Sequence, residues 1–171
     1  RTIYTLGVEE QTGRENALYT AIHPHILDGE RVLIFVDQIR HGNRLVNVSP
    51  FFGKHRPQEI YGTESKTERK IGEDAFRDGT RPVLITTLLK EGVNIPEIDV
   101  IVNASARKAE WLVRQQGGRG VRLREGKSRV IVYDFIDATH KILLAHSRAR
   151  YAAYKKEGYE ITLIDPLRPI I

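Results

Sequence analysis

The sequence contains no cysteine among its 171 residues. It can therefore form no disulfide, no thiolate zinc site and no cysteine nucleophile, and a reducing compartment is the default expectation. Long apolar runs are also missing, because segments such as residues 130–133 and 100–102 fall far short of the roughly 20 residues that a membrane span needs. We expect no membrane segment.

The start, the length and the charge of the chain indicate how many domains it has and what kind of partner it binds. It begins with Arg1 and has no charged-then-apolar leader, so we expect a piece of a longer polypeptide. Its length and its 40% apolar content predict one folded domain over residues 1–171. The 27 basic and 22 acidic residues give a net charge of +5, which suits a polyanionic partner.

Apolar, β-prone segments alternate with helix-like segments along the chain. Strands are predicted at residues 31–36, 83–87, 99–103 and 129–135, with weaker candidates at residues 57–61 and an edge strand at 160–164. Near-continuous Val, Ile and Leu suits strands covered on both faces. The alternation predicts a three-layer α/β domain with a mainly parallel central sheet flanked by helices, and functional loops at the carboxyl ends of the strands.

Two helices carry clear boundary signals. Ser65 and Glu68 match a capping box, and Gly79 stops the helix that follows. This helix is expected to pack on the sheet through three residues: Ile71, Ala75 and Phe76.

The second helix covers residues 139–157, with Asp137 as its expected cap and Gly158 as its stop. Its expected buried side consists of Ile142, Ala145, Ala149, Ala152 and Ala153, with Lys and Arg largely on the other side. Further helices are predicted at residues 14–27 and 107–116, and residues 166–171 are expected to form a loosely held tail. The domain then divides into a lead-in helix (1–30), a motif-bearing core (31–137) and a C-terminal helix and tail (138–171).

The segment Gln115-Gln-Gly-Gly-Arg-Gly-Val-Arg122 is the most informative. Its glycines let the backbone approach a ligand closely, and Arg119 and Arg122 can contact phosphate oxygens in bidentate fashion. Taken alone, the segment is equally compatible with a solvated basic loop. Residues 86–96 form a second candidate phosphate-binding segment, because a strand here ends in hydroxyls that can hold phosphates. The alternative is an ordinary strand end followed by a turn.

The order and spacing of these segments resemble the C-terminal half of superfamily-two helicases. Residues 31–45 resemble motif IV, residues 86–96 resemble motif V, and residues 115–122 fit the Q-x-x-G-R-x-x-R form of motif VI. Residues 61–79 resemble the stretch between motifs IV and V. The resemblance implies a RecA-like fold and a role as the C-terminal motor domain of an ATP-dependent helicase or translocase.

The same resemblance implies roles at matching positions. Arg119 and Arg122 would reach the γ-phosphate across an interdomain cleft, with Arg122 as arginine finger and Gln115 as a polar helper. Three further residues would lie near the nucleotide: Gly92, Asn94 and Gly118. Five would contact nucleic acid: Thr86, Thr87, Gly62, Thr63 and Gln38.

A phosphate loop and an acidic pair for magnesium are both missing from the sequence. We therefore expect ATP and Mg to be held mainly by an N-terminal RecA-like domain of the same polypeptide, and this chain alone to be inactive as an ATPase. Motif V has Thr86-Thr87 and motif VI begins with Gln115-Gln116, which departs from DEAD-box RNA helicases. Residues 137–160 are similar to phage and bacterial DNA-remodelling helicases, so DNA is favoured over RNA and a bacterial or phage-infected cytoplasm is expected.

Other chemistries find less support in the residues. His23-Pro-His25 is the only close histidine pair and lacks a carboxylate cluster, so no metal site is expected. A dinucleotide-binding enzyme would need a glycine fingerprint after its first strand, which residues 37–42 lack. The alternative function is that of a protein without enzymatic activity: a non-catalytic nucleic-acid-binding or regulatory α/β module derived from a helicase fold.

Overall fold

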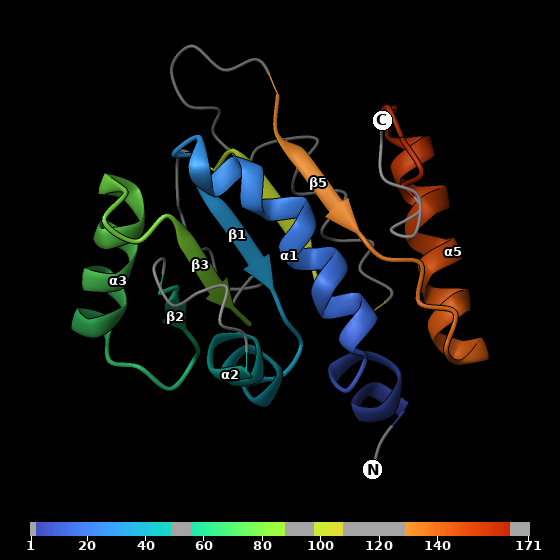
Figure 1. Cartoon of the computed structure of the whole chain (residues 1–171), viewed down its shortest axis with the longest axis horizontal. Helices are drawn as coiled ribbons and strands as arrows, with labels where there is room; N and C mark the ends of the chain where they lie inside the picture. The colour runs from blue at the N-terminus through green and yellow to red at the C-terminus, as the bar shows by residue number, and fades with distance from the viewer. Residues whose placement is uncertain (1–2, 49–55, 88–97, 108–128, 165–171) are drawn as a thin grey trace.

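The computed structural model describes residues 3–48, 56–87, 98–107 and 129–164, and Figure 1 draws the other residues as a grey trace. Apart from Arg107, the predicted helix at 107–116 lies outside the described residues, and so does the predicted tail at 166–171. The described helices are η1 (Thr5–Glu9, a π-helix), α1 (Thr12–Leu27), α2 (Ile39–Val48), α3 (Lys66–Asp78) and α5 (Lys141–Lys156).

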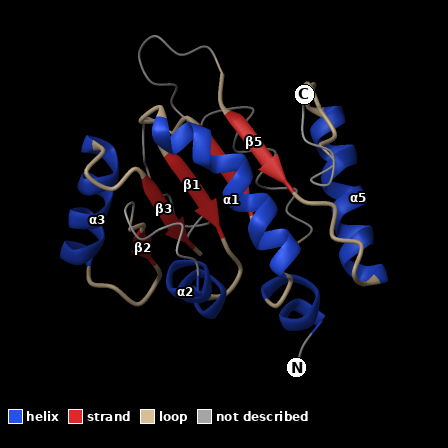
Figure 2. Cartoon of the chain, in the orientation of Figure 1, coloured by secondary structure: helices blue, strands red, loops and turns tan. Residues whose placement is uncertain are grey.

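The described residues form a central five-stranded sheet, and every neighbouring pair of strands in it is parallel. In chain order the strands are β1 (Val32–Phe35), β2 (Gln58–Ile60), β3 (Val83–Thr86), β4 (Val100–Asn103) and β5 (Ile131–Asp134), and their spatial order is β2-β3-β1-β4-β5. Every residue of β1, β3 and β4 is buried, as expected for strands covered on both faces. The four strong strand predictions and the weaker one at 57–61 are confirmed (Figure 2).

The predicted edge strand at residues 160–164 is wrong. These residues belong to no strand, and Leu163 and Ile164 are 69% and 52% exposed. A short apolar alternation forms a strand only when a partner edge is available. Here α5 lies beside β5, the outer strand (Figure 1).

Helices cover both faces of the sheet, which confirms the three-layer α/β architecture. On one face, Leu18 and Ile22 of α1 pack against alternate strand residues such as Ile34. On the other face, Phe76 of α3 packs against residues one position along the strands, such as Leu33. Burial of each such side chain stabilises the fold by about 1.5–3 kcal/mol.

Helix α3 begins as its sequence predicts, and its predicted packing on the sheet is correct for Phe76 and wrong for Ile71. The Ser65 hydroxyl accepts a hydrogen bond from the Glu68 amide, the Glu68 carboxylate accepts one from the Ser65 amide, and Gly79 ends the helix with a φ of 86°. Phe76 is fully buried, whereas Ile71 is 65% exposed, so its predicted contact with the sheet is wrong. Gly72 is buried at that place, and a Cβ there would lie 3.0 Å from Ile60 Cδ1, so a larger residue would require the side chains of β2 to shift.

The predictions for α5 were correct for its end and wrong for its cap and its buried face. His140, rather than Asp137, precedes the helix and accepts a hydrogen bond from the Ile142 amide at 3.2 Å. Gly158 follows the helix with a φ of 80°, as predicted. The buried residues are Leu143, Ser147, Arg150 and Tyr154.

On the predicted buried side of α5, Ala149 and Ala153 are half-buried. Ala145, Ala152 and Ile142 are exposed. Alanine gains little from burial, and a buried arginine needs an acidic partner, so the position of Asp134 decides which face of α5 turns inward. Among the described residues, no helix is long and apolar enough to cross a membrane.

The capping box provides a test of how α3 is stabilised. Ser65→Ala removes the acceptor for the Glu68 amide and should lower the free energy of unfolding by about 1 kcal/mol, measured by urea denaturation. Thr67→Ala, an exposed hydroxyl in the first turn of the same helix, serves as the control and should change it by less than about 0.5 kcal/mol. Equal losses in the two variants would contradict the capping assignment.

Candidate site at the carboxyl edge of the sheet

The five residues predicted to contact nucleic acid come together at one edge of the sheet. Gln38 follows β1, and Gly62 and Thr63 follow β2. Thr86 is the last residue of β3, and Thr87 follows it. These three strands are neighbours in the order β2-β3-β1 and run in the same direction. The residues that follow these strands, although distant in sequence, therefore lie side by side. In Figure 1 this edge of the sheet is where the arrowheads of β1 and β3 point toward α2.

The five residues differ in their exposure. Gly62 and Thr63 are exposed, Gln38 and Thr87 are half-buried, and Thr86 is fully buried in the sheet. A contact between the Thr86 hydroxyl and a ligand therefore requires the atoms that cover it to move. Contact of these residues with nucleic acid stays a prediction.

Two helices begin at this edge and direct the positive ends of their dipoles toward it. At the start of α3, the Glu68 carboxylate already occupies the first turn, and hydrogen bonds from the Ser65 side chain and backbone lower its pKa. Helix α2 has no acidic residue in its first turn and carries exposed Arg40 there. The start of α2, next to Gln38, is thus the more favourable of the two for an anion.

The other half of the edge, at β4 and β5, contains a buried polar network. Asn103 and Asp134 are partners in the register of the two strands, and Asn103 Nδ2 donates to Asp134 Oδ2 at 3.1 Å. Ser105 Oγ donates to Asn103 Oδ1 at 2.8 Å. These contacts fix the carboxyl ends of both strands relative to each other.

Arg150 of α5 supplies the positive charge of this network and is 1% exposed. Its Nε donates to Asp134 Oδ2 at 2.8 Å, its Nη2 donates to the Phe135 carbonyl at 2.9 Å, and its Nη1 donates to the Arg107 carbonyl at 2.8 Å. Tyr154 Oη donates to Asp134 Oδ2 at 3.0 Å, and burial, followed by the Asp134 charge, raises the pKa of Tyr154. One guanidinium therefore connects α5, β5 and the residues that follow β4.

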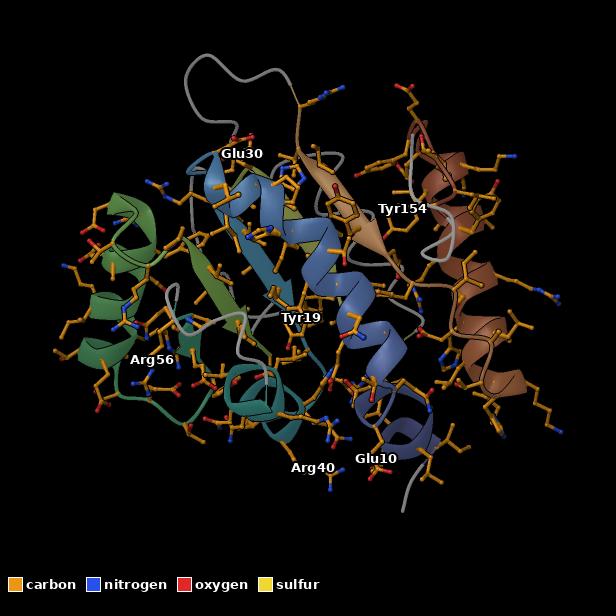
Figure 3. All side chains as sticks on the ribbon, viewed as in Figure 1. Glu10, Tyr19, Glu30, Arg40, Arg56 and Tyr154 are labelled. Carbon is orange, nitrogen blue, oxygen red and sulfur yellow. The ribbon has the colours of Figure 1, made fainter. Side chains whose placement is uncertain are left out.

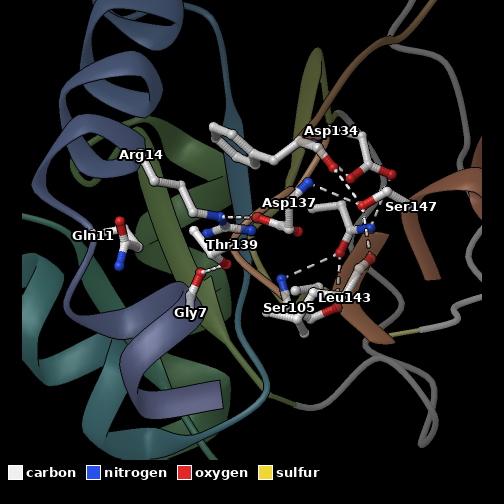
Figure 4. Close-up of polar contacts among 12 residues, drawn as sticks. Gly7, Gln11, Arg14, Ser105, Asp134, Asp137, Thr139, Leu143 and Ser147 are labelled. Atoms are coloured by element: carbon white, nitrogen blue, oxygen red, sulfur yellow. Dashed lines mark hydrogen bonds and ion pairs between the residues drawn. The ribbon is translucent and has the colours of Figure 1, made fainter. Parts of the chain in front are cut away.

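Asp137 extends the network to α1 (Figure 4). Arg14 Nε donates to Asp137 Oδ1 at 2.7 Å, and the Asp137 amide donates to Ser147 Oγ at 3.0 Å. The Arg14 guanidinium also lies 4.2 Å from the centre of the Phe135 ring. Asp137 is thus a link between helices instead of the cap of α5.

Arg107 is the last described residue before the segment that carries most of the predicted nucleotide-binding residues. Its carbonyl is held by Arg150, and its Nε forms an ion pair with Asp37, which follows β1. Six predicted residues lie outside the described part of the chain: Gln115, Gly118, Arg119, Arg122, Gly92 and Asn94. The structure fixes the point from which residues 108–128 depart, and the position of the arginine pair stays a prediction.

His41 of α2 is buried at the same edge. Tyr4 Oη lies 2.8 Å from His41 Nδ1 and also accepts a hydrogen bond from the Asp37 amide at 3.3 Å. Burial, and then the charges of Arg14 and Arg44, lower the pKa of His41 to about 3. His41 is therefore neutral at physiological pH, and the lead-in segment is attached to the end of β1.

Sequence reasoning missed the residues that organise this edge, above all Arg150, Asp134 and His41. The available signals were weak: Asp134 is an acidic residue inside an apolar strand, and Arg150 lies among the alanines of α5. His25, a member of the only close histidine pair, bonds instead to Glu30 Oε2 at 2.6 Å and Tyr133 Oη at 2.9 Å. No group of His, Asp or Glu suited to a metal ion occurs in the described ranges.

Comparison with known families and structures identifies the class of protein. Residues 13–124 match the model of the helicase conserved C-terminal domain. The C-terminal domain of the DEAD-box protein Dbp5 has a similar fold, with a TM-score of 0.58 and 23% identity over 88% of this chain and 82% of that one. The phage T4 protein UvsW also has a similar fold, with a TM-score of 0.62 and 15% identity over 86% of this chain and 33% of that one.

Three relatives show similarity in sequence. A protein described as a mitochondrial ATP-dependent helicase, irc3 of Schizosaccharomyces pombe, is 30% identical over 70% of this chain and 20% of that protein. The ATP-dependent RNA helicase DRS1 of Debaryomyces hansenii is 31% identical over 60% of this chain and 13% of that protein. A protein described as helicase D10 of Escherichia phage T5 is 25% identical over 86% of this chain and 33% of that protein.

The chain belongs to the helicase conserved C-terminal domain family, as the RecA-like C-terminal domain of a superfamily-two helicase. It spans a third or less of the length of these relatives.

The Arg150–Asp134 pair is open to a double-mutant cycle. Arg150→Met leaves the Asp134 carboxylate without its cation and should lower the free energy of unfolding by about 3–5 kcal/mol. The double variant Arg150→Met/Asp134→Leu removes both charges and should be more stable than Arg150→Met alone. Denaturant unfolding of the single and double variants measures this coupling.

The matched control is the exposed ion pair between Arg77 and Asp74 of α3, whose side chains are 39% and 50% exposed. Arg77→Met should lower the free energy of unfolding by less than about 1 kcal/mol, because water solvates both charges. If Arg150→Met costs no more than Arg77→Met, the Arg150 network does not stabilise the fold as described.

The lowered pKa of His41 predicts a pH dependence of stability. The unfolded chain binds a proton near the ordinary pKa of 6.5, whereas the folded protein does so only near 3, so acid favours unfolding between these values. His41 should account for a loss of about 2 kcal/mol between pH 7 and pH 5, measured by urea unfolding. His41→Gln should reduce this loss, and the exposed control His23→Gln should not. An identical pH dependence in the wild type and His41→Gln would refute the assignment.

Proposed function

We propose that the chain is the C-terminal motor domain of an ATP-dependent nucleic-acid helicase or translocase. It works by closing on a nucleotide held by an N-terminal RecA-like domain of the same polypeptide. The proposal rests on one observation: the predicted nucleic-acid contacts and the start of the arginine-bearing segment lie at the same edge of the sheet. The predicted nucleic-acid contacts follow β1, β2 and β3, and Arg107, from which the segment with the arginine pair departs, is held at the same edge.

The contacts to nucleic acid are proposed to involve phosphates. Exposed Gly62 and Thr63 offer a backbone amide and a hydroxyl, and half-buried Gln38 and Thr87 offer an amide and a second hydroxyl. Such groups bind phosphate oxygens and do not read base sequence. Binding of this kind is nearly independent of sequence and weakens as salt rises.

The contacts to the nucleotide are proposed to come from the segments around Asn94 and Arg119. Arg119 and Arg122, assisted by Gln115, contact the γ-phosphate of ATP when the domains close, and Gly92, Asn94 and Gly118 lie beside the nucleotide. ATP and Mg would be held mainly by the N-terminal domain. Water would attack the γ-phosphorus of ATP, and the bond to the β-phosphate oxygen would break to release ADP and phosphate. Arginine stabilises the negative charge of such a transition state and contributes on the order of 10³–10⁵ in rate. Without the N-terminal domain, this chain is inactive.

DNA is proposed as the substrate, in the cytoplasm of a bacterial or phage-infected cell. The choice of DNA rests on the resemblance of residues 137–160 to DNA-remodelling helicases, and the similarity to helicase D10 of phage T5 over 86% of the chain supports the phage-infected cell. Two relatives described as RNA helicases, DRS1 of Debaryomyces hansenii over 60% of the chain and DEAD-box helicase 53 of Oryza sativa over 77%, favour RNA instead. Stimulation of ATP hydrolysis by DNA and RNA strands of the same sequence and length distinguishes the two substrates.

The arginine-finger assignment is tested in the polypeptide that includes the N-terminal domain. Arg122→Ala should lower the rate of ATP hydrolysis by about 10³-fold or more while ATP affinity changes by less than about threefold, because the finger acts mainly in the transition state. Arg129→Ala, an exposed arginine ahead of β5, is the matched control and should retain activity. Unchanged turnover in Arg122→Ala would eliminate the finger assignment, and a binding module without catalysis would show no hydrolysis even as the wild type.

A further inference from the structure

Helix α5 carries basic side chains and no acidic ones. Its sixteen residues include Lys141, Arg148, Arg150, Lys155 and Lys156, and none is Asp or Glu. Helix α3 differs, because its four basic residues are interspersed with four acidic ones. The positive charge of α5 is therefore not neutralised within the helix, and the nearest acidic residues in sequence lie beyond its two ends.

Three of these cations lie on one exposed face, which we call the basic face of α5. The exposed positions Lys141, Ala145, Arg148, Ala152 and Lys155 recur at intervals of four and three residues, so they form one stripe along the helix. Figure 3 shows nitrogen-tipped side chains that point away from the domain along the outer side of α5. The fourth exposed cation, Lys156, lies at the end of the stripe.

The buried network fixes this orientation. Arg150, Ser147 and Tyr154 turn inward to Asp134 and Asp137, and Leu143 packs with Val8. The basic face lies on the opposite side of the helix and cannot rotate inward without breaking the Arg150–Asp134 pair. It is held outward by the fold.

The geometry of the basic face fits a polyphosphate chain. With a rise of 1.5 Å per residue, Lys141 and Arg148 are separated by about 10 Å along the helix, and the stripe to Lys155 is about 20 Å long. Ala145 and Ala152 separate the cations and leave the helix surface open to close approach. Tyr151, 38% exposed, lies beside the stripe, and its ring is 5.4 Å from Lys155 Nζ.

We propose that the basic face of α5 binds the phosphate backbone of a DNA duplex, outside the contacts at the carboxyl edge. The choice of partner rests on the proposed function. A duplex carries one negative charge per about 1.7 Å of its axis, so a stripe of this length meets several phosphates. An anionic membrane is a weaker fit, since a membrane-bound helix inserts a continuous apolar face, whereas the stripe of α5 consists of cations and alanines.

The test measures binding of the 171-residue chain to a fluorescent DNA duplex by anisotropy across a salt series. Arg148→Gln/Lys155→Gln removes two cations and retains residues of good helix propensity. We expect affinity near 0.1 M salt to fall by roughly tenfold or more, and the slope of log K against log salt to decrease by about 2.

The matched control is Arg56→Gln/Lys70→Gln, which removes the same two residue types. Both are exposed, and they lie next to β2 and on α3, at the edge of the sheet opposite to β5 and α5. The control should change the salt slope by less than half as much as the α5 variant. Equal effects of the two variants would mean that only net charge matters and would overturn the proposal.

Further arms separate this proposal from the proposed function and from other partners. If Gln38→Ala/Thr63→Ala weakens DNA binding and the α5 variant does not, the proposed function stands and the α5 proposal fails. The reverse result supports the α5 proposal and contradicts the carboxyl-edge contacts.

Other partners are tested with the same α5 variant. If this variant loses binding to vesicles of anionic lipid and binds DNA as the wild type does, the basic face is assigned to a membrane. Preferential, α5-dependent binding of an RNA duplex would assign it to RNA. Either of these results, or absence of DNA binding by the wild type at low salt, would overturn the α5 proposal.

Discussion

The structure depends on one buried ion pair, between Arg150 of α5 and Asp134 at the end of β5. Removing two charges from water is costly, and their attraction offsets that cost only when nearby groups satisfy the remaining donors and acceptors. Here the Phe135 and Arg107 carbonyls accept from the guanidinium, and the carboxylate accepts from Tyr154. Since these groups belong to three different segments, the pair fixes the packing of α5 and the ends of β4 and β5 together.

The same pair has consequences on both sides of α5. Inside the domain it holds Arg107, which also pairs with Asp37 after β1, so the two halves of the carboxyl edge are connected. Outside the domain it turns the cations of α5 toward solvent. A single constraint thus places the start of the arginine-bearing segment and orients the basic face that we propose as a second DNA-binding surface.

The sequence was sufficient to predict the parallel sheet, because apolar runs and capping signals are local properties of the chain. The capping box at Ser65 and the glycine stops at Gly79 and Gly158 are examples. The buried face of α5 was not predictable in this way: alanine spacing suggested one face, whereas the partner of Asp134 lies sixteen residues away and is recognised only in the folded chain. For the candidate site, the sheet explains why segments after β1, β2 and β3 meet, and the roles of Arg119 and Arg122 continue to rest on motif order.

In the proposed motor, the arginine pair contacts a nucleotide bound by another domain while Arg150 stays paired with Asp134. The most direct measurement is a crystal structure of the polypeptide with both domains, a non-hydrolysable ATP analogue and DNA. We expect the guanidinium groups of Arg119 and Arg122 within hydrogen-bonding distance of the γ-phosphate oxygens, about 2.7–2.9 Å, and an intact Arg150–Asp134 pair. A complex in which both arginines instead form ion pairs inside this domain, away from the nucleotide, would contradict it.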